Sequence, residues 1–213
     1  MFVYSLSGLQ LDESGGGAPV EIEDNETTAR TAVYQTFGRV FLGVDDQGWE
    51  LASSGTWAKE IGDAGRLLAF AYDPGDSPAV DDRGALERQL GGLTLQARDY
   101  FDDPDRMHDE VVRFYEYFGL GASEDARPVD HLVTECDFLQ YVTFKEAAAT
   151  SDRLRASYRR AQLDFLDRHF SVWVPRLAEK LAADGSPFFA WASAALARFV
   201  EADRAYVAQL LGA

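Results

Sequence analysis

The stretch from residue 128 to residue 142 constrains the fold most, and it reads Pro-Val-Asp-His-Leu-Val-Thr-Glu-Cys-Asp-Phe-Leu-Gln-Tyr-Val. Pro128 suits a first helical position because its φ is already fixed, and a carboxylate at Asp130 in the first turn is favoured by the unpaired amides and the helix dipole. The sequence therefore predicts a helix that begins at Pro128, with Asp130 and His131 at its solvent-accessible mouth. Its inward stripe is expected to contain Leu132, Glu135, Phe138, Leu139 and Val142.

The rest of the chain also shows helical periodicity. Apolar residues recur at steps of three and four, and no stretch combines sustained alternation with hairpin chemistry. The predicted fold class is all-α, a single helical domain of about seven or eight helices. Further helices are expected over residues 27–44, 56–72, 82–100 and 103–118, from a cap at Thr150 or Ser151 with a bend around Trp173 and Pro175, and from Pro187 onward.

The N-terminal segment has a different composition. Residues 12–26 hold six acidic residues, three consecutive glycines and no basic residue. Such a segment buries too little apolar surface to offset its ordering entropy. We expect residues 1–26 to form a mobile acidic and glycine-rich tail, and residues 27–213 to form the helical domain.

The net charge argues against some binding partners, and the cysteine content excludes some kinds of covalent link and metal site. The net charge of -16 argues against nucleic acid and anionic membranes and favours a cationic partner, although acidity also serves plain solubility. The single cysteine, Cys136, excludes an internal disulfide and any multi-cysteine metal site within one chain. The sequence shows no signal peptide and no membrane span, so we expect a cytoplasmic protein.

Catalytic motifs are missing from the sequence. It contains no glycine-rich phosphate loop, no His-Glu-x-x-His, no Gly-x-Ser-x-Gly and no paired-cysteine spacing. His131 and Glu135, four residues apart, would supply at most two metal ligands, and a histidine beside a helix carboxylate is the simpler interpretation. We therefore expect no metal, no cofactor and no enzymatic activity.

Three motifs together carry a family resemblance. Pro-x-Asp-His-Leu followed by Glu135 resembles the signature of the TorD/NarJ-type chaperones, cytoplasmic helical proteins that assist maturation of molybdenum-containing redox enzymes. Phe-Tyr-x-Tyr-Phe-Gly-Leu at residues 114–120 and His-Phe-x-x-Trp-x-Pro at residues 169–175 resemble further elements of that family. Arg127 departs from the pattern, since many members carry glutamate there. The chain looks most like the chaperones of the type II dimethyl-sulfoxide-reductase group.

The resemblance implies a function and a site. It implies a chaperone that binds the twin-arginine signal peptide and the catalytic subunit of a molybdopterin-containing redox enzyme, and assists its cofactor insertion and assembly before export. A receptor for a basic and apolar peptide needs carboxylates beside an apolar groove. The alternative is a small helical enzyme or nucleotide-binding protein that uses Asp130 and His131. The expected peptide-binding residues are Pro128, Asp130, His131, Glu135, Phe114, Tyr117, Asp102, Asp103 and Asp105.

Overall fold

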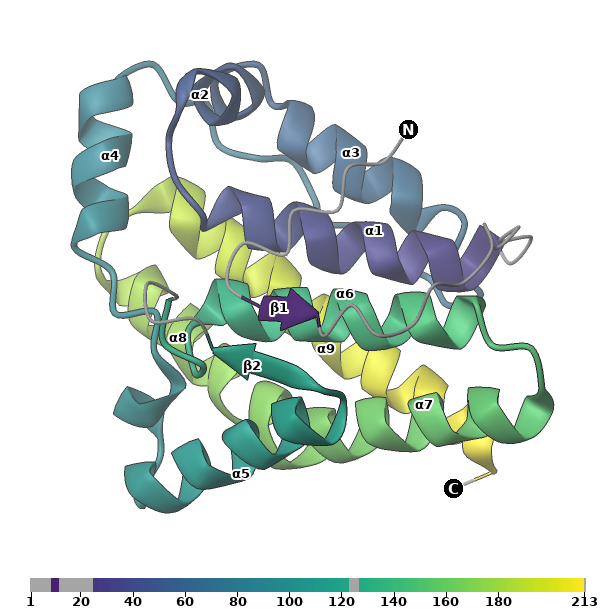
Figure 1. Ribbon diagram of the computed structural model, residues 1–213. Helices are drawn as coiled ribbons and strands as arrows, with labels where there is room; N and C mark the ends of the chain where they lie inside the picture. Colours follow the sequence, from purple (N-terminus) through teal and green to yellow (C-terminus); the bar gives the residue numbers. More distant parts are fainter. Residues whose placement is uncertain (1–8, 12–24, 123–126, 213) are drawn as a thin grey trace.

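The computed structural model describes residues 9–11, 25–122 and 127–212 and is almost entirely helical (Figure 1). Its α-helices are α1 (Asn25–Val40), α2 (Asp46–Ser53), α3 (Thr56–Gly65), α4 (Arg83–Gly91), α5 (Pro104–Tyr117), α6 (Leu132–Ala147), α7 (Asp152–Phe165), α8 (Ser171–Ala183) and α9 (Pro187–Leu211). A 3-10 turn, η1 (Ala97–Tyr100), precedes α5, and a π-helical turn, η2 (Leu166–Phe170), joins α7 to α8. The predicted all-α class is confirmed.

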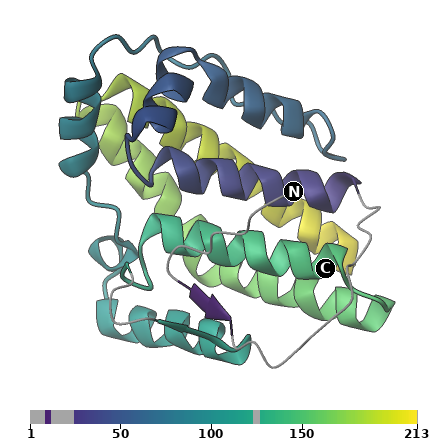
Figure 2. The ribbon, with the colours of Figure 1, turned by 45° about the horizontal axis from the view of Figure 1, so that its top comes forward.

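Helix α6 lies at the centre of the packing. Figure 1 shows α3, α1, α6 and α7 in succession from top to bottom, and α1 packs along α6 while α8 packs along α9. Figure 2 shows α9 running behind α1 and α6. Every residue from Leu132 to Gln140 is buried, so α6 is covered all round, whereas the sequence predicts one inward stripe.

The start of α6 corrects the predicted helix boundary. The helix begins at Leu132 rather than at Pro128, and the imidazole Nδ1 of His131 caps it by accepting the amide hydrogen of Val133 at 3.2 Å. Backbone hydrogen bonds hold the preceding residues instead: Ala97 N–H donates to the carbonyl of Asp130, and Leu132 N–H donates to the carbonyl of Leu95, both at 2.8 Å. This pairing with a segment distant in sequence prevents an earlier helical turn.

Helices α2 to α4 also differ from their predicted bounds. Asp45 caps the new helix α2, where the sequence predicts only a stop. The predicted helix 56–72 ends at Gly65, because the chain folds back: a Cβ at Gly65 would lie 2.9 Å from the carbonyl oxygen of Tyr72. The predicted helix 82–100 stops at Gly91, and only its last residues form the separate turn η1. Glycine, the most flexible residue, ends these helices where tertiary contacts favour a turn.

Other caps follow the sequence. Asp103 accepts the amide hydrogen of Arg106 at the start of α5, and Gly119, with φ of 67°, follows its end. Ser151 caps α7. The expected bend lies at η2, one turn before Trp173, and the helix continues through Pro175. Since α7, η2 and α8 form one continuous helix, the described residues hold eight helices, as predicted.

A two-stranded antiparallel pairing joins the beginning of the chain to its middle. Strand β1 (Leu9–Leu11) pairs with β2 (Leu120–Ala122), with Gln10 opposite Gly121. The sequence predicts no strand in this region. The predicted mobile tail at residues 1–26 lies for the most part outside the described residues.

Candidate functional site

The segment before α6 is held by an ion pair whose carboxylate is buried. The guanidinium of Arg98 donates from Nε to Oδ2 of Asp130 at 2.8 Å and from Nη2 to Oδ1 at 2.9 Å. The Asp130 side chain is fully buried, while that of Arg98 is 41% exposed. Burial alone would raise the pKa of Asp130, but the hydrogen bonds and charge of Arg98 outweigh it and lower that pKa. Asp130 therefore does not lie at a solvent-accessible mouth, and that prediction is wrong.

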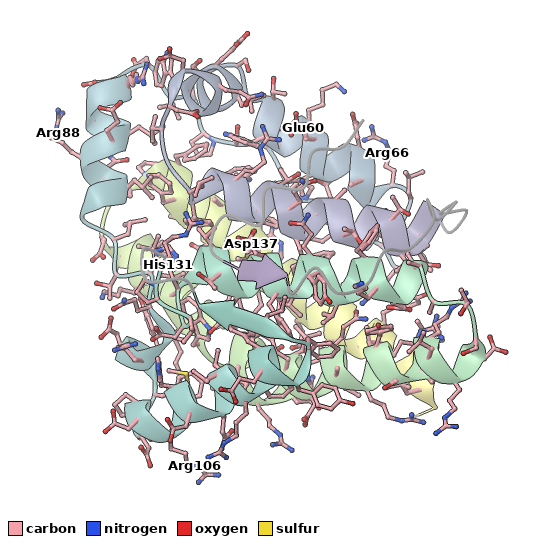
Figure 3. The ribbon with its side chains drawn as sticks, viewed as in Figure 1. Glu60, Arg66, Arg88, Arg106, His131 and Asp137 are labelled. Carbon is pink, nitrogen blue, oxygen red and sulfur yellow. The ribbon has the colours of Figure 1, made fainter. Side chains whose placement is uncertain are left out.

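His131 caps α6 with a neutral ring. Burial lowers the pKa of His131 to about 4, and the charge of Arg127 adds to this effect. The capping bond requires an unprotonated Nδ1, which agrees with a neutral imidazole. Figure 3 places His131 at the start of α6 and Asp137 further along the same helix. Within residues 9–11, 25–122 and 127–212 no group of three potential ligands gathers for a metal ion.

Glu135 is buried inside the helical packing. Trp173 Nε1–H donates to Oε2 of Glu135 at 2.8 Å, and Oε1 has no hydrogen-bond partner. Burial raises the pKa of Glu135 to about 8, so its carboxyl group is largely protonated at neutral pH. Two of the resemblance motifs thus contact each other directly, through Glu135 of one and Trp173 of the other.

A buried ionic cluster at the other end of α6 is missing from the sequence interpretation. Arg30 of α1 is fully buried and donates to Asp203 of α9, to Glu146 of α6 at 2.9 Å, and to Gln162 of α7. Arg159 donates to the second oxygen of Glu146 at 2.6 Å. Burial alone would lower the pKa of Arg30, but the two carboxylates outweigh it and raise that pKa.

A sequence signal for this cluster exists. Arg30 shares the apolar face of α1 with Val33 and Phe37, and Asp203 shares that of α9 with Phe199 and Val207. A charged residue on an apolar helical face requires a buried partner, because an isolated buried charge is costly. The pattern predicts burial but not which residues pair.

A groove lies between α5 and α7. It has a volume of about 720 Å³. Phe118 stacks near Tyr158 and Phe114 packs edge-on to Phe165, so the two helices run antiparallel. Tyr117 projects into the groove with 77% of its surface exposed. The lining residues are Glu110, Arg113, Phe114, Tyr117, Phe118, Ser157, Arg160, Ala161, Leu163, Asp164, Asp167, Arg168 and Leu211.

Five of the nine expected site residues lie on α5 or just before it. Phe114 and Tyr117 line the groove, and Asp102, Asp103 and Asp105 lie exposed at the N-terminal end of α5. Asp103 uses its carboxylate to cap the helix. The other four do not line this groove: Pro128 is exposed elsewhere, His131 is half-buried, and Asp130 and Glu135 are buried.

His169 lies behind the groove at its Glu110 end. Its ring packs edge-on against Phe114, and Nε2 lies 3.8 Å from Oε2 of Glu110. The side chain is 1% exposed, and neither ring nitrogen has a hydrogen-bond partner. Burial lowers the pKa of His169 to about 4, so the ring is neutral. His169 belongs to η2, and π-helical turns occur often at functional sites.

Comparison with known proteins identifies relatives over part of the chain. Residues 96–179 match the family model of the nitrate reductase delta subunit. The selenate reductase assembly chaperone protein of Thauera selenatis is 40% identical over 126 residues, which are 56% of this chain and 65% of that protein. The chlorate reductase assembly chaperone protein of Ideonella dechloratans is 36% identical over 106 residues, or 47% of this chain and 55% of the relative.

A third relative aligns over a longer stretch of the chain. The dimethyl sulfide dehydrogenase assembly chaperone protein of Rhodovulum sulfidophilum is 29% identical over 154 residues, or 67% of this chain and 58% of the relative. The chain thus spans roughly half to two thirds of the length of these relatives. No solved structure matches it. The resemblance to the TorD/NarJ-type family is confirmed, and the relatives are named as chaperones rather than as enzymes.

Proposed function

We propose, from the similarity of residues 96–179 to the TorD/NarJ-type family, that this protein is a cytoplasmic chaperone for one molybdopterin-containing redox enzyme. It binds the twin-arginine signal peptide of the catalytic subunit and assists cofactor insertion and assembly before export. The family match is the observation that carries this proposal, because it includes α5, α6 and α7 and hence both walls of the groove.

The surface of α5 supports the peptide-binding part of the proposal. Phe114, Phe118 and Tyr117 offer apolar and aromatic surface for the apolar stretch of a signal peptide. Asp105 lies nine residues before Phe114 on α5, and Asp102 lies three residues further back, just before the helix; neither has an ion-pair partner among the described residues. Carboxylates beside an apolar groove suit a peptide that joins an arginine pair to an apolar stretch.

In this proposal, the four expected site residues before and within α6 support the fold and do not contact the peptide. Asp130 and Glu135 are buried and engaged by Arg98 and Trp173, so a peptide does not reach them without opening the fold. Together with Pro128 and His131 they hold the segment that precedes α6. The same contacts argue against the alternative enzyme or nucleotide site, because Asp130 and His131 are both committed to structural hydrogen bonds.

The partners and compartment are also part of the proposal. The net charge of -16 disfavours nucleic acid and anionic membranes. None of the helices in the described part of the chain is long and apolar enough to cross a membrane. We expect the chaperone to need no metal or cofactor of its own.

Calorimetry with synthetic peptides tests the proposal. The wild-type protein is expected to bind a twin-arginine signal peptide with micromolar or better affinity, and a peptide with Ala-Ala in place of Arg-Arg at least about tenfold more weakly, since charge-assisted hydrogen bonds contribute about 1.5–3 kcal/mol each. The variant Asp102→Asn/Asp105→Asn should lose most of this discrimination.

A matched variant controls for net charge. Asp76→Asn/Asp81→Asn removes the same charge from exposed residues far from α5 in sequence and should bind like the wild type. Equal affinity for the Arg-Arg and Ala-Ala peptides would contradict peptide recognition through the arginine pair.

A further inference from the structure

Glu110 differs from the other acids that line the groove between α5 and α7. Its side chain is 24% exposed, whereas those of Asp164 and Asp167 are 46% and 42% exposed. One of its oxygens, Oε1, accepts a hydrogen bond from Nε of Arg106 at 3.0 Å. The other oxygen, Oε2, accepts no hydrogen bond within the part of the chain that the structure describes. This second oxygen is therefore available to a bound group.

The imidazole of His169 lies behind this oxygen. Its Nε2 is 3.8 Å from Oε2 of Glu110, which is too far for a hydrogen bond. The ring is covered by Phe114 and Phe101, and among the described residues neither nitrogen has a hydrogen-bond partner. Buried polar groups are normally hydrogen-bonded, so two unpartnered nitrogens in one buried side chain call for an explanation.

One donor nitrogen can serve both atoms. Twice an N–H···O length of about 2.9 Å is about 5.8 Å, which exceeds the 3.8 Å between Oε2 of Glu110 and Nε2 of His169. Because burial lowers the pKa of His169 to about 4, its ring is neutral and one of its nitrogens can accept a hydrogen bond. A guanidinium suits this pair, since it carries positive charge, has several N–H donors and packs well against an aromatic ring such as Phe114.

The described lining of the groove carries no net charge. It contains equal numbers of carboxylates and guanidinium groups, three of each. They are Glu110, Asp164 and Asp167, and Arg113, Arg160 and Arg168. A cationic segment therefore binds best where it takes the place of an arginine of this chain.

Arg106 is the arginine most readily replaced. It is 76% exposed, more than Arg168 and Arg204, which pair with the other two acids of the groove. It lies four residues before Glu110 on the same helix, and exposed pairs with this spacing contribute little to stability. Its exchange for another guanidinium is therefore inexpensive.

We propose that Glu110 and His169 form an arginine subsite of the groove, and that Arg106 partly occupies this subsite in the free protein. One arginine of the client segment replaces Arg106 at the carboxylate of Glu110 and also donates to Nε2 of His169. The loss of Arg106 frees the Glu110 side chain to turn, which exposes the buried nitrogen. The other arginine remains for Asp102 and Asp105. This inference rests on the proposed peptide-binding function and names the residues that recognise one arginine of the pair.

Peptides with a single arginine test the role of Glu110. Calorimetry measures peptides in which Arg-Arg, Ala-Arg, Arg-Ala or Ala-Ala precedes the same apolar stretch. With the wild type each single alanine should weaken binding at least about fivefold, because each arginine makes charge-assisted hydrogen bonds. With Glu110→Gln one of the two alanines should weaken binding less than about twofold, while the other keeps its effect.

A neighbouring acid provides the control for this experiment. Asp109→Asn removes an exposed carboxylate that is adjacent in sequence but does not line the groove, and this variant should behave like the wild type. Full effects of both alanines with Glu110→Gln would overturn the subsite.

Removal of Arg106 tests the exchange. Arg106→Gln should bind the Arg-Arg peptide about twofold more tightly, because the competing side chain is gone. This gain should disappear in Arg106→Gln/Glu110→Gln. Arg153→Gln removes the same charge from an exposed α7 residue outside the groove lining and should show no gain. Equal gains for Arg106→Gln and Arg153→Gln would show a general effect of net charge and overturn the exchange.

Nitrogen-15 NMR of the histidine rings tests the role of His169. The chain contains three histidines, and the contact with Phe114 assigns the signals of His169. The saturated complex with the Arg-Arg peptide should show a shifted Nε2 signal of His169, whereas His131, which caps α6, should be unaffected. An unshifted His169 signal in that complex would remove His169 from the subsite.

The outcomes separate the inference from the proposed function. If the wild type binds the Arg-Arg peptide more tightly than the Ala-Ala peptide but Glu110→Gln behaves like the wild type, peptide recognition stands and the subsite fails. If the wild type binds all four peptides alike, or none of them, the proposed function fails and this inference with it.

Discussion

The two ends of α6 both bury carboxyl groups, but they differ in how fully these groups are hydrogen-bonded. At the C-terminal end, both oxygens of Glu146 accept hydrogen bonds, from Arg30 and Arg159. At the N-terminal end, Glu135 has one bonded and one unpartnered oxygen, and an oxygen of Asp137 is likewise unpartnered. The carboxylate of Glu146 is thus paired with two guanidinium groups, whereas burial raises the pKa of Glu135 to about 8 and that of Asp137 to about 7.

This difference separates two uses of a buried polar group. The Arg30 cluster ties α1, α6, α7 and α9 together, and its charges are mutually neutralised. The N-terminal end contains titratable groups whose ionisation costs stability within the ordinary pH range. The resemblance motifs include the N-terminal end of α6, whereas the larger number of buried ion pairs lies at its C-terminal end.

The largest expected effect comes from removing the arginine of the cluster. Arg30→Met leaves Glu146 and Asp203 buried without their shared partner, and breaking a buried pair costs about 3–5 kcal/mol. Denaturant unfolding should show this loss, while Arg88→Met on the exposed face of α4 should change the free energy of unfolding by less than about 0.5 kcal/mol. A loss below about 1 kcal/mol for Arg30→Met would show that the cluster does not hold the helices together.

A smaller effect is expected at Glu135 and depends on pH. Because the folded-state pKa of about 8 lies above the unfolded value near 4.5, the folded state binds more protons, so stability falls as pH rises from about 5 to 8. Glu135→Gln removes this term and still accepts the Trp173 hydrogen bond. The variant should gain about 2–4 kcal/mol relative to the wild type over that pH range.

Unfolding curves at several pH values measure this difference. The contribution of Asp137 is common to both proteins and cancels in the comparison. Parallel pH dependences of the two proteins would mean that Glu135 stays ionised in the folded state, and the contrast between the two ends of α6 would disappear.

The smallest effect is expected for Asp130→Asn. The asparagine still accepts one hydrogen bond from Arg98, and water reaches the half-exposed guanidinium, so the expected loss of stability is about 1 kcal/mol. The affinity for a twin-arginine peptide should change by less than twofold, because Asp130 is buried. A tenfold loss of affinity at unchanged stability would instead make Asp130 a direct peptide contact, as the sequence interpretation has it.

Local sequence signals predicted some elements and missed others. The caps at Asp103 and Ser151 are confirmed, since a cap depends only on residues within one turn. The predicted start of α6 is four residues too early, because local patterns do not show the backbone hydrogen bonds that join Asp130 to Ala97 and Leu132 to Leu95. In the same way, Pro128 and Asp130 resemble the first turn of a helix, although the carboxylate of Asp130 pairs with Arg98.

Some residues of the groove can be found from local sequence, whereas others are found only from the packing of the helices. Phe114, Tyr117 and the acids of α5 were identified from the sequence, since they lie within one helix or next to it. Arg160, His169 and the opposing wall come from the helix that α7 and η2 form, and only packing brings them to α5. A single helix can be predicted from its own periodicity, but a groove needs two.

The sequence by itself determined the all-α class, the caps of single helices and the family resemblance, because each depends on neighbouring residues or on short motifs. Only the tertiary structure decided which buried charges are neutralised: Arg30 meets Glu146 and Asp203 across separations of 116 and 173 residues. Helical periodicity fixes the face on which a charge lies, whereas its partner, and therefore its pKa, depends on which face of another helix packs against it.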